Sequence, residues 1–137
     1  MIFNVIAGNA DAHGKNFSIL YGEEGPRLAP LYDLLATVAY PDLSQKLAMK
    51  IGKRATLAEL DAKGWTAFAA DAGLGLPLIR RRVAEISEAT IARANEVAAE
   101  LARPGLDGKS LLQFVEMIAD RAGRCALSTR GKLSESE

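Results

Sequence analysis

Hydrophobic residues recur at helical spacing through the second half of the chain. Apolar positions three and four residues apart share one face of a helix. One such stripe consists of Ile79, Val83, Ile86, Ala94, Val97 and Leu101, and a second consists of Leu111, Val115, Ile118, Ala122 and Cys125. The pattern predicts two long helices, the first beginning at Pro77 and ending before Pro104, the second capped by Asp107. Their short connection makes the pair antiparallel. We expect the stripes to form core; an exposed partner-binding face is the alternative.

Shorter elements occupy the first half of the chain. Apolar residues from Ile2 to Ala7 are typical of the last turns of a helix, and Gly8 ends it in a left-handed conformation. The small and polar residues 9–16 predict a loop. A β-prone run over residues 17–21, a glycine- and proline-rich turn and a return run over residues 27–29 predict a hairpin directly after this loop.

The pattern is less regular between the hairpin and the long helices. Residues 34–40 predict a helical turn, whereas residues 43–51 alternate weakly and fit strand and coil equally well. Thr56 and Glu59 have the spacing of a capping box with Thr56 as the N-cap. The alanine-rich run over residues 62–72 predicts one more helix. Its apolar face consists of Trp65, Phe68 and Ala69, and Gly73 ends it.

The composition is typical of one globular domain. The chain has 137 residues, of which 49% are hydrophobic and 25% charged. Its 17 basic and 17 acidic residues balance, so nothing in the charge calls for nucleic acid or an anionic membrane as a partner. The basic run Arg80-Arg81-Arg82 is more simply a solvated helix face than a binding patch.

The cysteine content and the apolar runs indicate the compartment. Cys125 is the only cysteine, and its setting among apolar residues at helical spacing indicates a buried, inert thiol rather than a nucleophile. A chain without a disulfide fits the reducing cytoplasm, where we expect this protein. No apolar run reaches the roughly 18 residues of a membrane-spanning helix, and the first residues lack the basic region of a secretory signal.

The candidate chemistry lies in the predicted loop and in a block after the hairpin. The loop contains Asn9-Ala10-Asp11-Ala12-His13-Gly14-Lys15-Asn16, and the later block is Leu28-Ala29-Pro30-Leu31-Tyr32-Asp33. Phosphoryl transfer needs one Asp at the attacking hydroxyl, an Asn oxygen for a metal ion and a second Asp that chelates Mg²⁺. Protein kinases carry them as H-R-D-x-x-x-x-N followed by D-F-G. Asp11 and Asn16 keep the Asp-to-Asn spacing, and Asp33 fits the later metal ligand.

Each of these residues also has a structural interpretation. Asp and Asn stabilise turns through their own backbone, so Asp11 and Asn16 could simply shape the loop and Asp33 could cap a following helix. His13 is the only histidine, which argues against zinc. A structural role, in which His13 bonds the backbone and holds the loop shape, is simpler than acid–base work. Lys15 fits a phosphate contact and a solvated side chain equally well.

Three longer stretches of sequence resemble a known protein family. Residues 9–20, residues 28–35 and Lys46-Leu47-Ala48-Met49 resemble the C-terminal part of the HipA family of serine/threonine kinases, the toxins of bacterial toxin–antitoxin pairs. The spacing is also similar to that of aminoglycoside phosphotransferases, but these extensions favour HipA. The resemblance implies a mainly α (α+β) fold over residues 1–131. In that fold a kinase-like helical C-lobe carries a short β-hairpin after the catalytic loop and a long antiparallel helix pair. Residues 132–137 are expected to be a disordered tail.

The resemblance also implies an activity and assigns residues to it. The activity would be ATP-dependent phosphorylation of a serine or threonine hydroxyl in a protein, with an aminoacyl-tRNA synthetase as the target type. Asp11, His13 and Lys15 occupy catalytic motif positions. Lys15, Asn16 and Asp33 would bind ATP, with Asn16 and Asp33 holding Mg²⁺. The usual partner of the family is a HipB-like DNA-binding antitoxin, and no direct contact of the chain with nucleic acid is expected.

The chain departs from the family because one wall of the kinase cleft is missing. It has no glycine-rich phosphate loop and no strand lysine with its partner glutamate. We therefore expect activity to require an N-lobe in the same or another chain, and the chain to be a fragment, a remnant or half of a split kinase. The alternative is a non-enzymatic helical module that binds an antitoxin or another chain.

Overall fold

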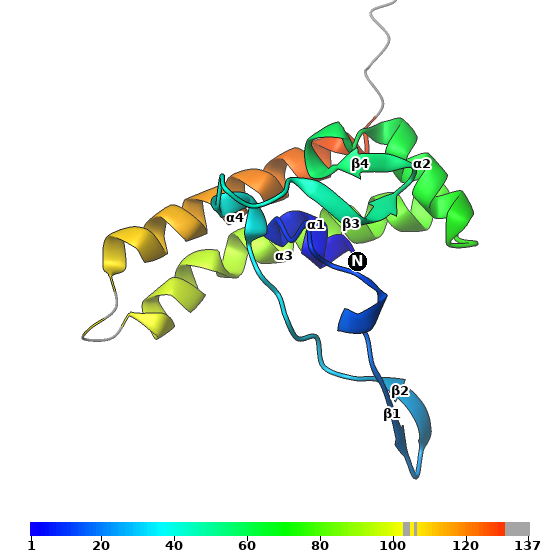
Figure 1. The fold of residues 1–137 in the computed structure, drawn as a ribbon, viewed down its shortest axis with the longest axis horizontal. Coiled ribbons are helices and arrows are strands. Elements are labelled where there is room, and N and C mark those ends of the chain that lie inside the picture. The colour runs from blue at the N-terminus through cyan, green and yellow to red at the C-terminus, as the bar shows by residue number, and fades with distance from the viewer. Residues whose placement is uncertain (103–104, 106, 131–137) are drawn as a thin grey trace, which may run out of the picture.

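Two long helices form the frame of the fold. The computed structural model describes residues 1–102, 105 and 107–130. In it α3 (Leu76–Leu101) and α4 (Gly108–Ser128) lie side by side as an antiparallel pair (Figure 1). The Asp107 carboxylate caps α4 by accepting the Lys109 N–H at 3.1 Å. The predicted pair is therefore confirmed, together with its capping aspartate, and α3 begins one residue before Pro77.

The core lies where α1 (Ile2–Ala7) and α2 (Ala62–Asp71) pack against this pair. Trp65 of α2 is fully buried; its indole N–H donates to Ser128 Oγ at 2.8 Å, and its ring meets Phe68 edge-on. A large ring with a satisfied polar end anchors α2 on α4. The other buried hydrophobic residues of the core are Val5, Ile6, Ile51, Leu60, Ala69, Ile79, Val83, Ala122 and Cys125.

The start of α2 differs from the sequence prediction. Asp61 is its N-cap, because the Asp61 carboxylate accepts the Gly64 N–H at 2.8 Å. Thr56 precedes only the short 3₁₀ turn η3 (Leu57–Glu59), and its side chain makes no capping hydrogen bond. The predicted capping box at Thr56 is therefore wrong. An aspartate directly before the helix can accept a hydrogen bond from one of its free N–H groups, so α2 begins after Asp61 and not after Thr56.

The C-terminal half of α3 and the N-terminal half of α4, called the outer halves below, are less buried than the hydrophobic stripes predicted. Ala98 is buried, but Val97 is 42% exposed and Leu101 is 45% exposed. The six-residue α1 extends about 9 Å, against about 39 Å for the 26 residues of α3, so it cannot cover the whole pair. An apolar groove of about 700 Å³ remains between the outer halves, bordered by Phe3 and Phe114. The expectation of continuous core along both stripes is wrong there.

Two small antiparallel hairpins complete the fold. β1 (Ile19–Gly22) pairs with β2 (Gly25–Leu28) and projects away from the helices, which confirms the predicted hairpin (Figure 1). β3 (Lys46–Ile51) pairs with β4 (Arg54–Thr56), so strand was the correct alternative there.

The segment between the hairpins is mostly irregular. The helical turn predicted over residues 34–40 shrinks to the 3₁₀ turn η2 (Thr37–Ala39). The mainly helical α+β fold class is confirmed, while the predicted tail over residues 132–137 lies outside the described residues. Within the described part, no helix combines the length and apolar character needed to cross a bilayer.

Candidate active site

The candidate loop leaves the core at the end of α1. Gly8 adopts the predicted left-handed conformation, with φ 78°, and its N–H donates to Val5 O at 3.3 Å. The guanidinium of Arg121 on α4 donates to Val5 O at 2.7 Å and to Ile6 O at 3.2 Å. A cation at the C-terminal end of a helix binds its free carbonyls and favours its dipole. Arg121 thus fixes the start of the loop to the helical core.

The loop is held from two further sides. The buried Thr37 hydroxyl donates to Gly8 O at 3.1 Å and accepts the Ala10 N–H at 2.8 Å. On the other side the Ala48 N–H of β3 donates to Ala10 O at 2.8 Å. These bonds satisfy buried backbone groups that would otherwise cost free energy. The loop is consequently a fixed platform and not a free connection.

Asn16 and Asp33 come together on this platform. Asn16 is buried at the end of the 3₁₀ turn η1 (Gly14–Asn16), and its Nδ2 donates to Asp33 Oδ2 at 2.6 Å. Its Oδ1 accepts the His13 N–H at 2.9 Å, which holds the amide in a fixed orientation. The hairpin returns the chain so that an amide and a carboxylate separated by 17 residues meet.

The backbone of Asp33 is in an unusual conformation. Its φ is 56°, in the left-handed region that is costly for a residue with a Cβ and least so for Asp and Asn. The Asn9 side chain donates to Asp33 O at 3.0 Å and so helps to hold this geometry. Strained backbone of this kind clusters at functional sites. Asn9, which the sequence analysis did not single out, thus helps to hold Asp33 in position to contact Asn16.

The remaining predicted residues lie around this pair. Asp11 is exposed; its N–H donates to Asn9 Oδ1 at 3.1 Å, and in the described chain no hydrogen bond joins its carboxylate to Asn16 or Asp33. Lys15 is exposed, and its carbonyl accepts the Tyr32 hydroxyl at 2.7 Å.

His13 is half-buried and contributes to the loop mainly through its backbone. Its N–H bonds Asn16, and its carbonyl accepts the Asn16 N–H at 3.0 Å. Nδ1 of its ring is buried without a hydrogen-bond partner among the described residues. His13 thus helps to shape the loop, but through its own backbone groups and not through ring Nδ1, and a catalytic role for its ring stays a prediction.

The donor set of the pair fits a hard cation such as Mg²⁺. Asn16 Oδ1 keeps one lone pair beyond its bond to His13, and Asp33 offers a carboxylate oxygen that Asn16 does not occupy. Mg²⁺ takes one or two protein carboxylates and completes its shell with water and substrate phosphates. Among the described residues no group of three or more His, Cys, Asp or Glu side chains has the geometry of a metal site. The pair can therefore act as an open half-site.

The sequence analysis missed several residues that hold the candidate loop, and one of them could have been recognised from the sequence. Asn4 is a polar residue inside an apolar helical run, and it is buried where its Oδ1 accepts Asn9 Nδ2 at 3.4 Å. A buried polar side chain needs a partner, so such a residue points to a structured neighbourhood. Thr37 and Arg121 left no comparable signal, because their partners lie far away in sequence.

A helical lobe that holds an asparagine–aspartate pair between a loop and the segment after a hairpin is the C-lobe arrangement of kinase-like proteins. The chain belongs to the family described as the HipA-like C-terminal domain, whose model matches residues 1–98. The resemblance noted from the motifs is thereby confirmed.

Individual relatives agree with this assignment. The chain is 54% identical over 127 residues to the Sinorhizobium fredii protein named "Putative kinase Y4mE", covering 93% of this chain and 30% of that protein. It is 42% identical over 76 residues to the serine/threonine-protein kinase toxin HipA of Shewanella oneidensis, covering 56% of this chain and 17% of the relative.

A solved structure shares the fold. It is the complex of HipA, HipB and operator DNA from Shewanella oneidensis MR-1, in which one chain matches with a TM-score of 0.83 and 28% identity. The match covers 96% of this chain and 32% of that one. The chain thus spans about a third of the length of Y4mE and of the matching chain in this structure.

Proposed function

We propose that this chain is the catalytic-loop lobe of a HipA-like serine/threonine protein kinase, which acts as the toxin of a toxin–antitoxin pair. The observation that carries the proposal is the meeting of Asn16 and Asp33 at 2.6 Å on a platform held by buried hydrogen bonds. A site for phosphoryl transfer works mainly by positioning and charge stabilisation, so rigid support for these two ligands is what the chemistry requires.

Each motif residue has a role in this proposal. Asp11 accepts or orients the proton of the attacking hydroxyl, for which its carboxylate is exposed. Asn16 and Asp33 hold Mg²⁺, which when bound neutralises charge on the phosphates of ATP. Lys15 is exposed beside Asn16 and contributes a positive charge toward a phosphate. His13 fixes the Asn16 amide through its backbone N–H.

The surface of the hairpin supports the proposal that a further lobe completes the cleft. Large hydrophobic side chains are exposed on the hairpin and on the segment after it, and they are Ile19, Leu20, Tyr21, Leu28, Leu31, Tyr32, Leu34 and Leu35. Contiguous exposed apolar surface marks interaction sites. We assign this surface to contact with an N-lobe that supplies the phosphate-binding wall, in the same or another chain.

The partners follow from the relatives by analogy. The matching structure is named as a complex of HipA with HipB and operator DNA. A HipB-like antitoxin is accordingly the proposed partner of the complete kinase, and a protein hydroxyl, such as one of an aminoacyl-tRNA synthetase, is its proposed substrate.

Calorimetric titration of Mg²⁺-ATP into the chain tests the proposal. The variant Asp33→Asn removes the carboxylate charge and keeps a side chain that tolerates the left-handed backbone. Asp42→Asn, in an exposed loop, is the matched control. We expect weak binding that Asp33→Asn abolishes and Asp42→Asn preserves. Absence of binding at millimolar ATP, or equal binding by both variants, would refute a nucleotide role for this pair and favour the interaction-module alternative.

A further inference from the structure

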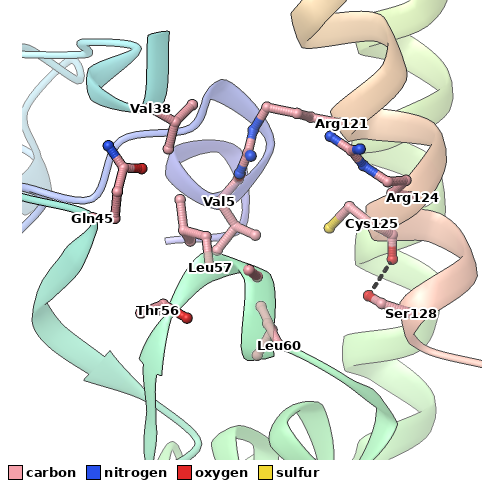
Figure 2. A pocket seen from close by; sticks show the side chains of 11 residues that line it. Val5, Val38, Gln45, Thr56, Leu57, Leu60, Arg121, Arg124, Cys125 and Ser128 are labelled. Atoms are coloured by element: carbon pink, nitrogen blue, oxygen red, sulfur yellow. Dashed lines mark hydrogen bonds between the residues drawn. The ribbon is translucent and has the colours of Figure 1, made fainter. Parts of the chain in front are cut away.

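A second cavity lies apart from the candidate active site. It has a volume of about 600 Å³ and opens between α1, the C-terminal half of α4 and the η3 turn, as Figure 2 shows. Val5, Val38 and Leu57 form apolar walls, whereas Arg121 and Arg124 extend from α4 on one side. The volume is within the range of small-molecule sites, which are about 300–1,000 Å³.

The charged side chains that line the cavity are all positive. Two arginines line it, three residues apart on the same helix face, and no aspartate or glutamate is among its described lining residues. Arg124 pairs with Asp120 at 2.8 Å outside the lining set. Arg121 has no carboxylate within ion-pair distance anywhere in the described chain. The cavity therefore carries positive charge that the protein neutralises only in part.

Arg121 retains donors for a ligand. Its Nε and Nη2 bond the carbonyls of Ile6 and Val5, which leaves Nη1 without a partner in the described part of the chain. Burial, together with the like charge of Arg124, lowers the pKa of the Arg121 guanidinium. A half-buried guanidinium of this kind is stabilised by an anion that approaches from the cavity.

We propose that this cavity binds a small amphipathic anion, with a phosphate or carboxylate held by Arg121 and Arg124. The apolar body of the ligand lies against Val5, Val38 and Leu57. Arginine forks match the planar or tetrahedral oxygens of such groups and bind them more strongly than neutral donors do. Gln45 and Thr56 stand at the same cavity and add neutral hydrogen-bonding capacity. The site does not use Asn16 or Asp33, although it shares Arg121 with the anchoring of the candidate loop.

The probe for the test is phenyl phosphate, followed by amide chemical shifts during an NMR titration. Benzoate distinguishes the two anion types, benzyl alcohol lacks the charge, and inorganic phosphate lacks the apolar body. We expect phenyl phosphate or benzoate to shift the amides of residues around Leu57, Arg121 and Arg124. Benzyl alcohol and inorganic phosphate are expected to bind at least about tenfold more weakly, because each loses one of the two kinds of contact.

Two substitutions separate the site from general charge effects. Arg124→Gln removes one guanidinium from an exposed side chain that does not hold α1, so the fold is kept. Arg81→Gln removes an exposed arginine of α3 outside the cavity. We expect Arg124→Gln to weaken phenyl phosphate binding about tenfold and Arg81→Gln to leave it unchanged. Equal effects of the two variants, shifts spread over all arginine-bearing surfaces, or tight binding of inorganic phosphate alone would overturn the proposal.

Discussion

The bonds from Arg121 to α1 should dominate the stability of the platform that carries the candidate loop. In Arg121→Met the apolar stem is kept, but two charge-assisted hydrogen bonds to backbone carbonyls are lost, at 2.7 Å and 3.2 Å. Hydrogen bonds to charged groups contribute about 1.5–3 kcal/mol each. The Val5 carbonyl keeps a second partner in the Gly8 N–H, so its loss costs less than that of Ile6 O. We expect a total loss of about 2–3 kcal/mol in the free energy of unfolding.

Urea unfolding followed by the fluorescence of Trp65 measures this loss, because Trp65 is the only tryptophan and is fully buried. The matched control is Arg124→Met, which removes an arginine one turn along α4. Its exposed i,i+4 pair with Asp120 contributes only about 0.3–0.5 kcal/mol. In thermal melts Arg121→Met is expected to lower the midpoint by roughly 6–10 °C. Equal destabilisation by the two variants would refute the proposed anchoring of α1.

Three further predictions concern caps and the buried thiol. Gly73→Ala is expected to lower the free energy of unfolding by about 1 kcal/mol, because Gly73 has φ 65° with open space at its Cβ position. Gly8→Ala should lower it clearly more, because a Cβ there would clash with the Val38 side chain; equal losses in urea unfolding would contradict this. The Arg54 side chain, and then the Gly64 N–H, hold the pKa of Asp61 below its usual value. Asp61→Ala should therefore destabilise α2 at pH 7, and the difference from the native chain should shrink as the pH falls through that lowered pKa; a difference that does not change as the pH is lowered would contradict this. Burial raises the pKa of Cys125 to about 11, so iodoacetamide at pH 8 should modify it only after unfolding; rapid modification of the folded chain would contradict this.

Local sequence patterns predicted the helices and the hairpin that are determined by residues close together in the chain. The helical spacing of Ile79 and Val83 identified α3, and the glycine- and proline-rich turn identified the first hairpin. The motif likewise predicted that Asn16 and Asp33 act together, and they meet in the structure. These features depend on residues close in the chain or on a single hairpin that returns it.

Features that depend on distant contacts were not predictable in the same way. The bond from Thr37 to Ala10 spans 27 residues, and that from Arg121 to Val5 spans 116. The exposure of Val97 also depends on how far a short α1 reaches along α3, which periodicity alone cannot reveal. The capping box at Thr56 failed because a better N-cap, Asp61, lay a few residues further on.

The proposed kinase function requires that Asn16 and Asp33 together hold the metal ion of a nucleotide. The most direct test replaces Mg²⁺ with Mn²⁺ and follows paramagnetic broadening of NMR signals in the presence of ATP. We expect selective broadening of the signals of the Asn16 side-chain amide and the Asp33 backbone amide, and loss of this broadening in Asp33→Asn. Broadening centred on the acidic turn at Glu23 and Glu24, or broadening at Asn16 that persists in the variant, would contradict it.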